Sequence, residues 1–147
     1  MNQDFRDLLA AFNDHHVDFI VVGAHALAAH GHVRATKDLD VWIRPAKDNA
    51  LRAIQALKAF GAPLQELTVD DLSIPGIIFQ IGVPPLRIDV LTAVDGLTFE
   101  EAWANRMHTV FADQPAAVLS RSDIILNKRT SARKQDLADI EALEKLG

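Results

Sequence analysis

The segment from Asp38 to Ile43 alternates between polar and apolar residues with a period of two. Successive side chains of a β-strand point to opposite faces of a sheet, so this period predicts a strand. Its apolar face consists of Leu39, Val41 and Ile43. Asp38 and Asp40 share the other face with Trp42, which is a candidate either for the core or for stacking on a nucleobase. The segment therefore predicts a sheet with one covered apolar face and two carboxylates opposite.

Helical and strand patterns follow one another along the rest of the chain. An apolar stripe begins at Phe5, Gly61 stands where a helix C-cap would, and capping boxes begin at Thr98 and Ser120. The predicted helices cover residues 5–12, 24–30, 49–60, 99–103 and two pieces of 121–147. The predicted strands cover residues 18–23, 38–43, 77–81 and 86–91, the last two as a hairpin. Residues 62–75 carry no clear pattern.

These elements predict an α/β or α+β fold, a small mixed sheet with helices packed against it. The inner stripe of the helix over 49–60 is expected to hold Leu51, Ile54 and Leu57. The inner stripe of the last helix is expected to hold Leu137, Ile140 and Leu143. No repeat or linker interrupts residues 1–147, so we expect one domain with a C-terminal helical segment over about 121–147.

Composition limits the classes of protein. No apolar run approaches the roughly 18 residues of a membrane span, and Asn2 begins a polar N-terminus unlike a signal peptide, so a cytoplasmic protein is expected. The absence of cysteine excludes disulfides and thiolate metal sites. The formal net charge of -5 argues against broad binding to DNA, although a local basic groove stays open.

A third aspartate, Asp89, lies inside an apolar segment, with Ile88 and Val90 facing the opposite way. If its strand neighbours the strand of Asp38 and Asp40, three carboxylates converge. Such a group repels itself unless a cation lies among them, and Mg²⁺ or Mn²⁺ prefers these oxygen ligands. The pattern predicts a metal site for phosphoryl or nucleotidyl transfer, although Asp-x-Asp pairs also occur on ordinary exposed strands.

Candidate phosphate contacts surround this site in the sequence. Gly23 ends a predicted strand, and the helix that follows it could present the backbone N–H groups of Ala24 and His25 to a phosphate. A tight turn explains the same glycine equally well. Just before Asp38, the candidates are Arg34, Thr36 and Lys37. An ordinary solvated loop is the alternative interpretation of these three.

Basic residues also gather near the end of an acidic chain. Lys128 and Arg133 could hold phosphate oxygens, lysine as a point charge and arginine as a fork. A solvated helix face, balanced by Asp136 and Asp139 among others, is the alternative. The six histidines match no zinc motif.

Four blocks in this order resemble the polymerase-beta-like nucleotidyltransferase superfamily, in particular its small bacterial members related to minimal nucleotidyltransferases and to the nucleotidyltransferases of toxin-antitoxin and abortive-infection systems. The blocks are Val21 to His25, Arg34 to Asp40, Arg87 to Val90, and Lys128 with 133–140. Together they span most of the chain. The resemblance implies a small mixed sheet with packed helices and a metal-dependent transfer reaction.

The resemblance also implies roles for single residues. Asp38 and Asp40 would bind the metals and the triphosphate, and Asp89 would help to activate the incoming hydroxyl. Gly23 and its neighbour would cradle the phosphates, and Lys128 would contact the triphosphate or the base. The family turn is usually Gly-Gly or Gly-Ser, whereas this chain has Gly23-Ala24. Ala24 lacks the serine hydroxyl but keeps its N–H group.

Three hypotheses follow. The first is a Mg²⁺-dependent or Mn²⁺-dependent nucleotidyltransferase that moves a nucleoside monophosphate from a nucleoside triphosphate to an unknown acceptor: a protein, an RNA or a small molecule. The second is a non-catalytic member of the fold that acts as an antitoxin or regulatory partner. The third is a glycosyltransferase whose Asp-x-Asp motif holds Mn²⁺ and a nucleotide sugar.

Overall fold

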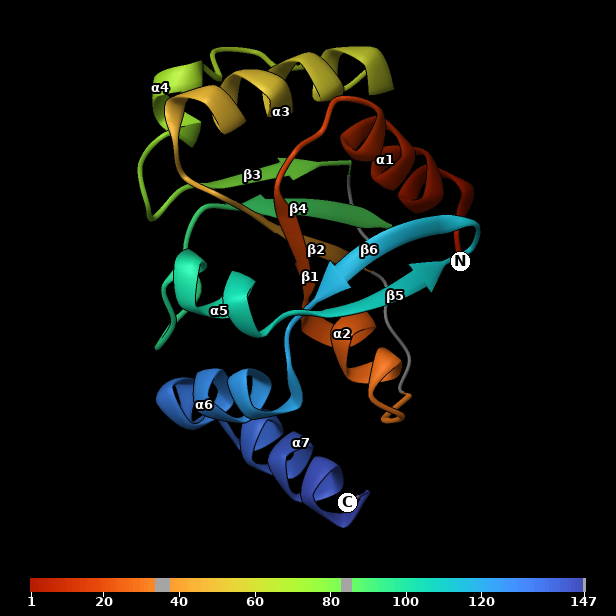
Figure 1. Ribbon diagram of the computed structural model, residues 1–147, viewed down its shortest axis with the longest axis vertical. Coiled ribbons are helices and arrows are strands. Elements are labelled where there is room, and N and C mark those ends of the chain that lie inside the picture. Colours follow the sequence, from red (N-terminus) through yellow and green to blue (C-terminus); the bar gives the residue numbers. More distant parts are fainter. Residues whose placement is uncertain (34–37, 83–85, 147) are drawn as a thin grey trace.

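A computed structural model describes residues 1–33, 38–82 and 86–146, and it shows one mixed sheet with helices on both faces (Figure 1). This confirms the predicted α/β architecture. The strands are β1 (Phe19–Val22), β2 (Asp38–Ile43), β3 (Ile78–Ile81), β4 (Arg87–Leu91), β5 (Met107–Phe111) and β6 (Gln114–Val118). The helices are α1 (Gln3–Asp14), α2 (Gly23–Ala29), α3 (Lys47–Phe60), α4 (Val69–Leu72), α5 (Phe99–Asn105), α6 (Arg121–Ser131) and α7 (Lys134–Lys145).

The strands lie in the order β3-β4-β2-β1-β6-β5. The central pair β2 and β4 is parallel, whereas β1 runs antiparallel to β2 and parallel to β6. An antiparallel hairpin forms each end of the sheet, β3 with β4 and β5 with β6. Because β2 has β4 on one side and β1 on the other, residues from both neighbours meet at Asp40.

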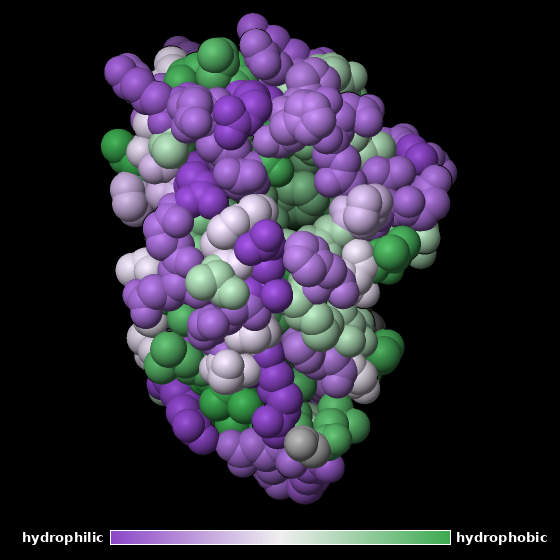
Figure 2. All heavy atoms as spheres, in the orientation of Figure 1, coloured by the Kyte–Doolittle hydropathy of each residue, from purple (hydrophilic) through white to green (hydrophobic). Residues whose placement is uncertain are grey.

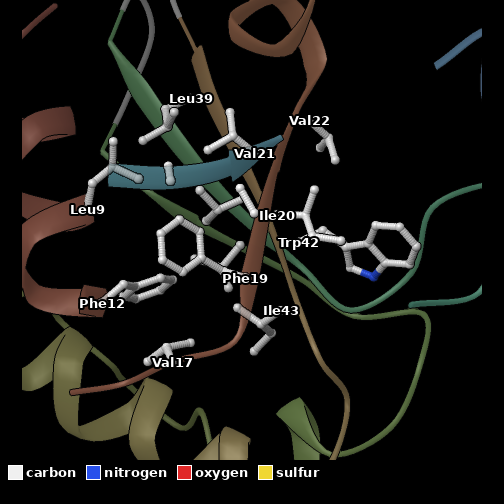
Figure 3. Close-up of a cluster of buried hydrophobic side chains, with 14 of the residues drawn as sticks. Leu9, Phe12, Val17, Phe19, Ile20, Val21, Val22, Leu39, Trp42 and Ile43 are labelled. Carbon is white, nitrogen blue, oxygen red and sulfur yellow. The ribbon is translucent and has the colours of Figure 1, made fainter. Parts of the chain in front are cut away.

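Helices cover both faces of the sheet. In Figure 1, α1, α3 and α4 lie on one side, and α2, α5, α6 and α7 lie on the other. Apolar side chains of α1 and β1, such as Phe12 and Phe19, pack together in the core (Figure 3). Trp42 belongs to this core, since it is 1% exposed and packs edge-to-face on Phe99 of α5 with the ring centroids 5.2 Å apart. Burial on this scale supplies the main driving force for folding.

Local signals in the sequence set the ends of several helices. Gly61 ends α3 with φ of 96°, a left-handed conformation that glycine adopts without a steric penalty. The side chains of Thr98 and Ser120 accept the backbone N–H groups of Glu101 and Asp123, so they cap α5 and α6 as the capping patterns predict. The hairpin of β3 and β4 is confirmed as well.

Two parts of the fold were not predicted. Residues 107–118 form the hairpin of β5 and β6, although β6 contains Pro115 and two alanines, which rarely favour strands. Pairing of Ile20 with Ala117 and of Val21 with Val118 stabilises β6 beside β1. The unassigned region 62–75 contains the short helix α4, which begins with a capping box of Thr68 and Asp71.

The predicted inner stripes were wrong at one position in each helix. Leu51 is 47% exposed because α3 buries a face of small alanines, which lets it lie close to its neighbours. Leu137 is 53% exposed, because α7 buries Asp136 and Asp139 beside Ile140 and Leu143. Hydrophilic side chains cover much of the face shown in Figure 2, with hydrophobic residues in separate small groups.

Candidate active site

The three aspartates lie on one face of two neighbouring strands. Asp40 of β2 is directly opposite Asp89 of β4, and Asp38 is opposite Arg87. Facing residues of paired strands point to the same side of a sheet, so the three carboxylates and the guanidinium gather there. The period-two pattern predicts this arrangement for the aspartates. We call Asp38, Asp40, Asp89 and Arg87 the carboxylate site.

Arg87 bridges two of the aspartates. Its Nη2 donates to Oδ2 of Asp38 and to Oδ2 of Asp89, each at 3.3 Å, and its Nε lies 3.0 Å from Oδ1 of Asp89. No role was predicted for Arg87 itself. The signal was present, since Arg87 precedes Asp89 by two positions in a strand and must share its face.

The electrostatics of the site are most unusual at Asp40. Burial raises the pKa of this carboxyl from 3.8 to about 7, with further increases from the charge of Asp89, a hydrogen bond to Asp89 and the charge of Asp38. The positive charge of Arg87 lowers this pKa but does not outweigh them. Asp40 therefore keeps its proton up to near neutral pH, as expected for a buried carboxyl group beside two other carboxylates.

Gly23 begins α2 directly beside Asp40. Its φ is +70°, and a Cβ atom placed on it would lie 2.3 Å from Oδ2 of Asp40. Val22, the residue before it, is paired with Asp40 across β1 and β2. Glycine is thus required for two reasons, a left-handed backbone and the close approach of a carboxylate.

The carboxylate site has the right chemistry for a divalent metal ion, but its side chains are occupied with one another. Among residues 1–33, 38–82 and 86–146, no three Asp, Glu, His or Cys side chains are arranged ready to hold a metal. Three neighbouring carboxylates supply the hard oxygen donors that Mg²⁺ or Mn²⁺ prefers. Arg87 already pairs with Asp38 and Asp89, so a metal ion held by all three carboxylates would compete with this guanidinium.

The candidate phosphate contacts lie in different surroundings. Ala24 is in the first turn of α2, where no side chain caps the helix start. The ring of His25 packs edge-to-face between Phe5 and Phe111, with centroids 5.7 and 6.0 Å away, and burial lowers the pKa of its imidazole. Arg34, Thr36 and Lys37 lie outside the described residues. Phosphate binding at these positions stays a prediction.

The two basic candidates near the C-terminus form a second charged group. We call Lys128, Arg133, Asp136 and Asp139 the C-terminal cluster. Nζ of Lys128 lies 2.9 Å from Oδ2 of Asp139 and 3.5 Å from Oδ1 of Asp136, and all three side chains are buried. Arg133 donates from Nε to Oδ2 of Asp136 at 2.8 Å and lowers the pKa of that carboxyl. The structure therefore shows both basic groups paired with α7.

One contact joins this cluster to the segment that enters β2. Nε2 of His32 lies 3.2 Å from Oδ1 of Asp139. His30 adds a contact from its Nε2 to the backbone oxygen of Leu119 at 2.8 Å. The chain is thus held against the C-terminal helices a few residues before Asp38, the first residue of the carboxylate site.

Residues 2–146 match the model of a protein family described as nucleotidyltransferases of unknown function (DUF6036). The chain belongs to this nucleotidyltransferase family. The match confirms the resemblance stated from the four sequence blocks and gives no support to a glycosyltransferase. Comparison with curated proteins gives no match.

Solved structures of nucleotidyltransferases share the fold. The antibiotic-resistance factor ANT(2'')-Ia is 17% identical with a TM-score of 0.66, and the alignment covers 99% of this chain and 83% of that one. The lincosamide adenylyltransferase LnuA, bound to lincomycin, is 14% identical with a TM-score of 0.66 and coverage of 100% and 98%. TM1012 from Thermotoga maritima is 11% identical with a TM-score of 0.62 and coverage of 97% and 89%.

In the described residues, no helix is both long and apolar enough to cross a membrane.

Proposed function

We propose that this nucleotidyltransferase moves a nucleoside monophosphate from a nucleoside triphosphate to an acceptor in a reaction that depends on Mg²⁺ or Mn²⁺. One observation carries the proposal: Asp40 lies opposite Asp89 on parallel strands, with Asp38 on the same face. The raised pKa of Asp40 supports it, because the excess of negative charge that raises this pKa also attracts a cation.

The proposed roles follow from the placement of each carboxylate. Asp38, Asp40 and Asp89 would hold the metal, which neutralises phosphate charge and stabilises the leaving oxygen when bound. Asp89 would accept the proton of the acceptor hydroxyl as its oxygen attacks the α-phosphorus. The bond from the α-phosphorus to the bridging oxygen breaks, and pyrophosphate leaves. The raised pKa of the neighbouring carboxyl of Asp40, about 7, supports a role for this group of carboxylates in proton transfer near neutral pH.

The triphosphate is proposed to lie beside the turn of Gly23 and Ala24. This turn touches Asp40, and the N–H groups that begin α2 have no side-chain cap. Arg34, Thr36 and Lys37 directly precede Asp38 in the sequence and are the nearest basic and hydroxyl groups along the chain. Lys128 and Arg133 could join them only by leaving their aspartate partners, so they are weaker candidates.

Small molecules are the favoured class of acceptor among the three considered. LnuA was solved with lincomycin bound, and ANT(2'')-Ia was solved with adenylyl-2''-tobramycin, a nucleotidylated small molecule. Both share the fold of this chain over nearly its whole length. A protein or RNA acceptor would instead need a broad complementary surface, for which the structure offers no specific support.

Titration with the four ribonucleoside triphosphates, with and without Mg²⁺, tests the proposal. We expect one or more to bind in a Mg²⁺-dependent manner and to lose that binding in Asp38→Asn and Asp89→Asn. Asp48→Asn is the matched control, because Asp48 is an exposed aspartate paired with Arg52 on α3. If no triphosphate binds under any metal condition, the enzymatic proposal is wrong.

Arg87 favours a second candidate, the regulatory partner without catalysis. Its guanidinium already neutralises part of the carboxylate site, as a protein that never binds metal would require. The same titration separates the two functions, since a regulatory partner should bind neither Mg²⁺ nor triphosphate. Co-purification of a protein with the wild-type chain would then be the next measurement.

A further inference from the structure

The carboxylate site lies in the middle of a row of paired residues that crosses four strands. Val22 of β1 is opposite Asp40 of β2, and Asp40 is opposite Asp89 of β4. On the far side of β4, Asp89 is opposite Gln80 of β3. Directly opposite residues of paired strands point to the same side of a sheet, so Gln80 shares the face of the aspartates. The row therefore runs from the turn of Gly23, which follows Val22, to the side chain of Gln80.

Gln80 is the open end of this row. β3 is the last strand on its side of the sheet, and Gln80 is exposed. Neighbouring strands lie about 4.8 Å apart, so Gln80 is one such step beyond Asp89. Its carboxamide makes no hydrogen bond in the part of the chain that the structure describes. A carboxamide offers two N–H donors and an acceptor oxygen without a charge. Next to Asp89 there is thus an exposed group that can bind a neutral hydroxyl.

The neighbouring row is apolar and is uncovered at the same end. Trp42 is opposite Leu91, and Leu91 is opposite Ile78 of β3. Helix α5 covers Trp42, which is 1% exposed, but Ile78 is 62% exposed. Ile78 and Gln80 lie two positions apart on β3, so they face the same way. β3 therefore presents an apolar group and a neutral polar group side by side, next to the carboxylate site.

The direction of the proposed reaction selects this end of the row for the acceptor. In phosphoryl transfer the attacking and leaving oxygens lie roughly in line, on opposite sides of the phosphorus. The triphosphate is proposed to lie at the turn of Gly23, so pyrophosphate leaves toward that end. A phosphorus held beside Asp40 and Asp89 is then attacked from the opposite end, across Asp89, where Gln80 and Ile78 lie.

We propose that Gln80 and Ile78 bind the acceptor, an uncharged small molecule whose apolar ring packs on Ile78. A second hydroxyl of this molecule, next to the reacting one, hydrogen-bonds to the carboxamide of Gln80. This inference rests on the proposed function. The reacting hydroxyl oxygen bonds to the α-phosphorus of the triphosphate, its proton passes to Asp89, and the bond to the bridging oxygen breaks as pyrophosphate leaves. Gln80 takes no part in these bond changes but selects the acceptor.

Three cyclohexane derivatives that differ in one group test this role. trans-1,2-Cyclohexanediol has the ring, a reacting hydroxyl and a second hydroxyl. Cyclohexanol lacks the second hydroxyl, and trans-2-aminocyclohexanol carries an ammonium group in its place at pH 7. Pairs of these compounds compete for the same enzyme with Mg²⁺ and each ribonucleoside triphosphate, and mass spectrometry measures both products. The product ratio gives relative kcat/KM values, whatever the fraction of active protein.

Variants of Gln80 should change these ratios in different ways. We expect Gln80→Leu to lower the ratio of diol product to cyclohexanol product by about three- to tenfold, the effect of one lost hydrogen bond. Gln80→Glu should raise the ratio of amino alcohol product to diol product about tenfold, because a carboxylate pairs with the ammonium group. Ile78→Ala should lower the yield of diol and cyclohexanol products alike, because both acceptors have the same ring.

Gln55→Glu is the matched control for the added charge. It makes the same change at an exposed position of α3, on the other side of the sheet (Figure 1), and should leave the ratios as in wild type. Ratios that are the same in wild type, Gln80→Leu and Gln80→Glu would overturn the proposal, as would transfer to none of the three compounds by a protein that binds Mg²⁺–triphosphate.

Side-chain amide signals separate this proposal from the proposed function. The ¹⁵N-labelled protein shows an NH₂ pair from Gln80, which its loss in Gln80→Leu assigns, and the backbone signals show whether each variant is folded. The diol should move this pair, with and without Mg²⁺–triphosphate, and cyclohexanol should move it less. Triphosphate binding without a diol shift overturns the acceptor role alone. A diol shift without triphosphate binding refutes the proposed function and leaves only a small-molecule site at Gln80.

Discussion

Two groups of aspartates lie on the same side of the sheet, but their charges are balanced differently. Among the described residues, the carboxylate site pairs Asp38 and Asp89 with the guanidinium of Arg87, and Asp40 lies beside them. The C-terminal cluster holds two carboxyl groups, of Asp136 and Asp139, against two cations, Lys128 and Arg133. The pKa values respond in opposite directions, raised to about 7 at Asp40 and lowered at Asp136.

This difference separates a carboxyl group with a raised pKa from one whose pKa is lowered by its cation partners. In the C-terminal cluster each buried carboxylate already has a cation, as a buried charge requires for stability. In the carboxylate site a proton on Asp40 makes up part of the missing positive charge. A divalent ion could replace that proton. The carboxylate site is therefore suited to binding a cation, and the C-terminal cluster to stabilising the fold.

The largest loss of stability is expected for a substitution in the C-terminal cluster. Lys128→Met removes the ammonium 2.9 Å from Asp139, whose side chain is fully buried, and should lower the free energy of unfolding by about 3–5 kcal/mol. Arg129→Met is the control, because its partner Glu144 is 3.0 Å away on an exposed surface and the pair contributes below about 1 kcal/mol. Urea unfolding measures both. A Lys128→Met protein of unchanged stability that binds Mg²⁺–triphosphate poorly would instead assign Lys128 to phosphate binding.

Gly23→Ala should give the second largest loss of stability. A methyl group there meets Oδ2 of Asp40 at 2.3 Å in a backbone with φ of +70°, so we expect a loss of about 1–3 kcal/mol together with weaker Mn²⁺ binding. Gly61→Ala separates the two causes. Gly61 has φ of +96° but nothing within 4 Å of an added Cβ, so only the backbone strain is shared. Equal losses of stability and of Mn²⁺ affinity in both variants would show that contact with Asp40 is unimportant.

The sequence predicts the carboxylate site better than the C-terminal cluster, and periodicity explains why. A period of two places Asp38, Asp40 and Asp89 on known strand faces, and only the pairing of β2 with β4 had to be supplied by the fold. The same period could have identified Arg87. In α7, by contrast, the apolar pattern selected Leu137, whereas ion pairs between helices turn Asp136 and Asp139 inward. Such pairs form between residues of separate helices and leave no local pattern.

Other parts of the fold could not be predicted from local sequence patterns either. Strands β1 to β4 carry Val and Ile and were predicted, but β6 contains Pro115, Ala116 and Ala117 and depends on β1 and β5 to pair with it. Trp42 was ambiguous until α5 was seen to cover it. Tertiary contacts decide these features, and a local pattern cannot contain them.

Arg87→Gln should change metal binding and stability at the carboxylate site. Loss of the competing guanidinium should strengthen Mn²⁺ binding about tenfold, equivalent to roughly 1.4 kcal/mol, and should lower the stability of the metal-free protein. Electron paramagnetic resonance measures the free Mn²⁺, and thermal unfolding with EDTA measures the second effect. Arg52→Gln serves as control, since Arg52 pairs with exposed Asp48 at 3.7 Å. Weaker Mn²⁺ binding in Arg87→Gln would mean that Arg87 positions the carboxylates for the metal rather than competing with it.

The two groups should also differ in the sign of their pH dependence. Between about 4 and 7, native Asp40 keeps a proton that the unfolded chain has lost, so in EDTA this residue makes stability fall as pH rises through that window. Asp136 has a lowered pKa, so its contribution is present above its ordinary value of 3.8 and is lost as pH falls below it.

Urea unfolding from pH 3 to pH 8 should therefore show a flatter upper range in Asp40→Asn and a flatter lower range in Asp136→Asn. Mg²⁺ should flatten the upper range of the wild-type protein too, because a bound cation favours the ionised form of Asp40. If Mg²⁺ leaves the wild-type profile unchanged while Asp40→Asn alters it, the carboxylates carry the raised pKa without binding a metal, and the two groups of aspartates are both structural.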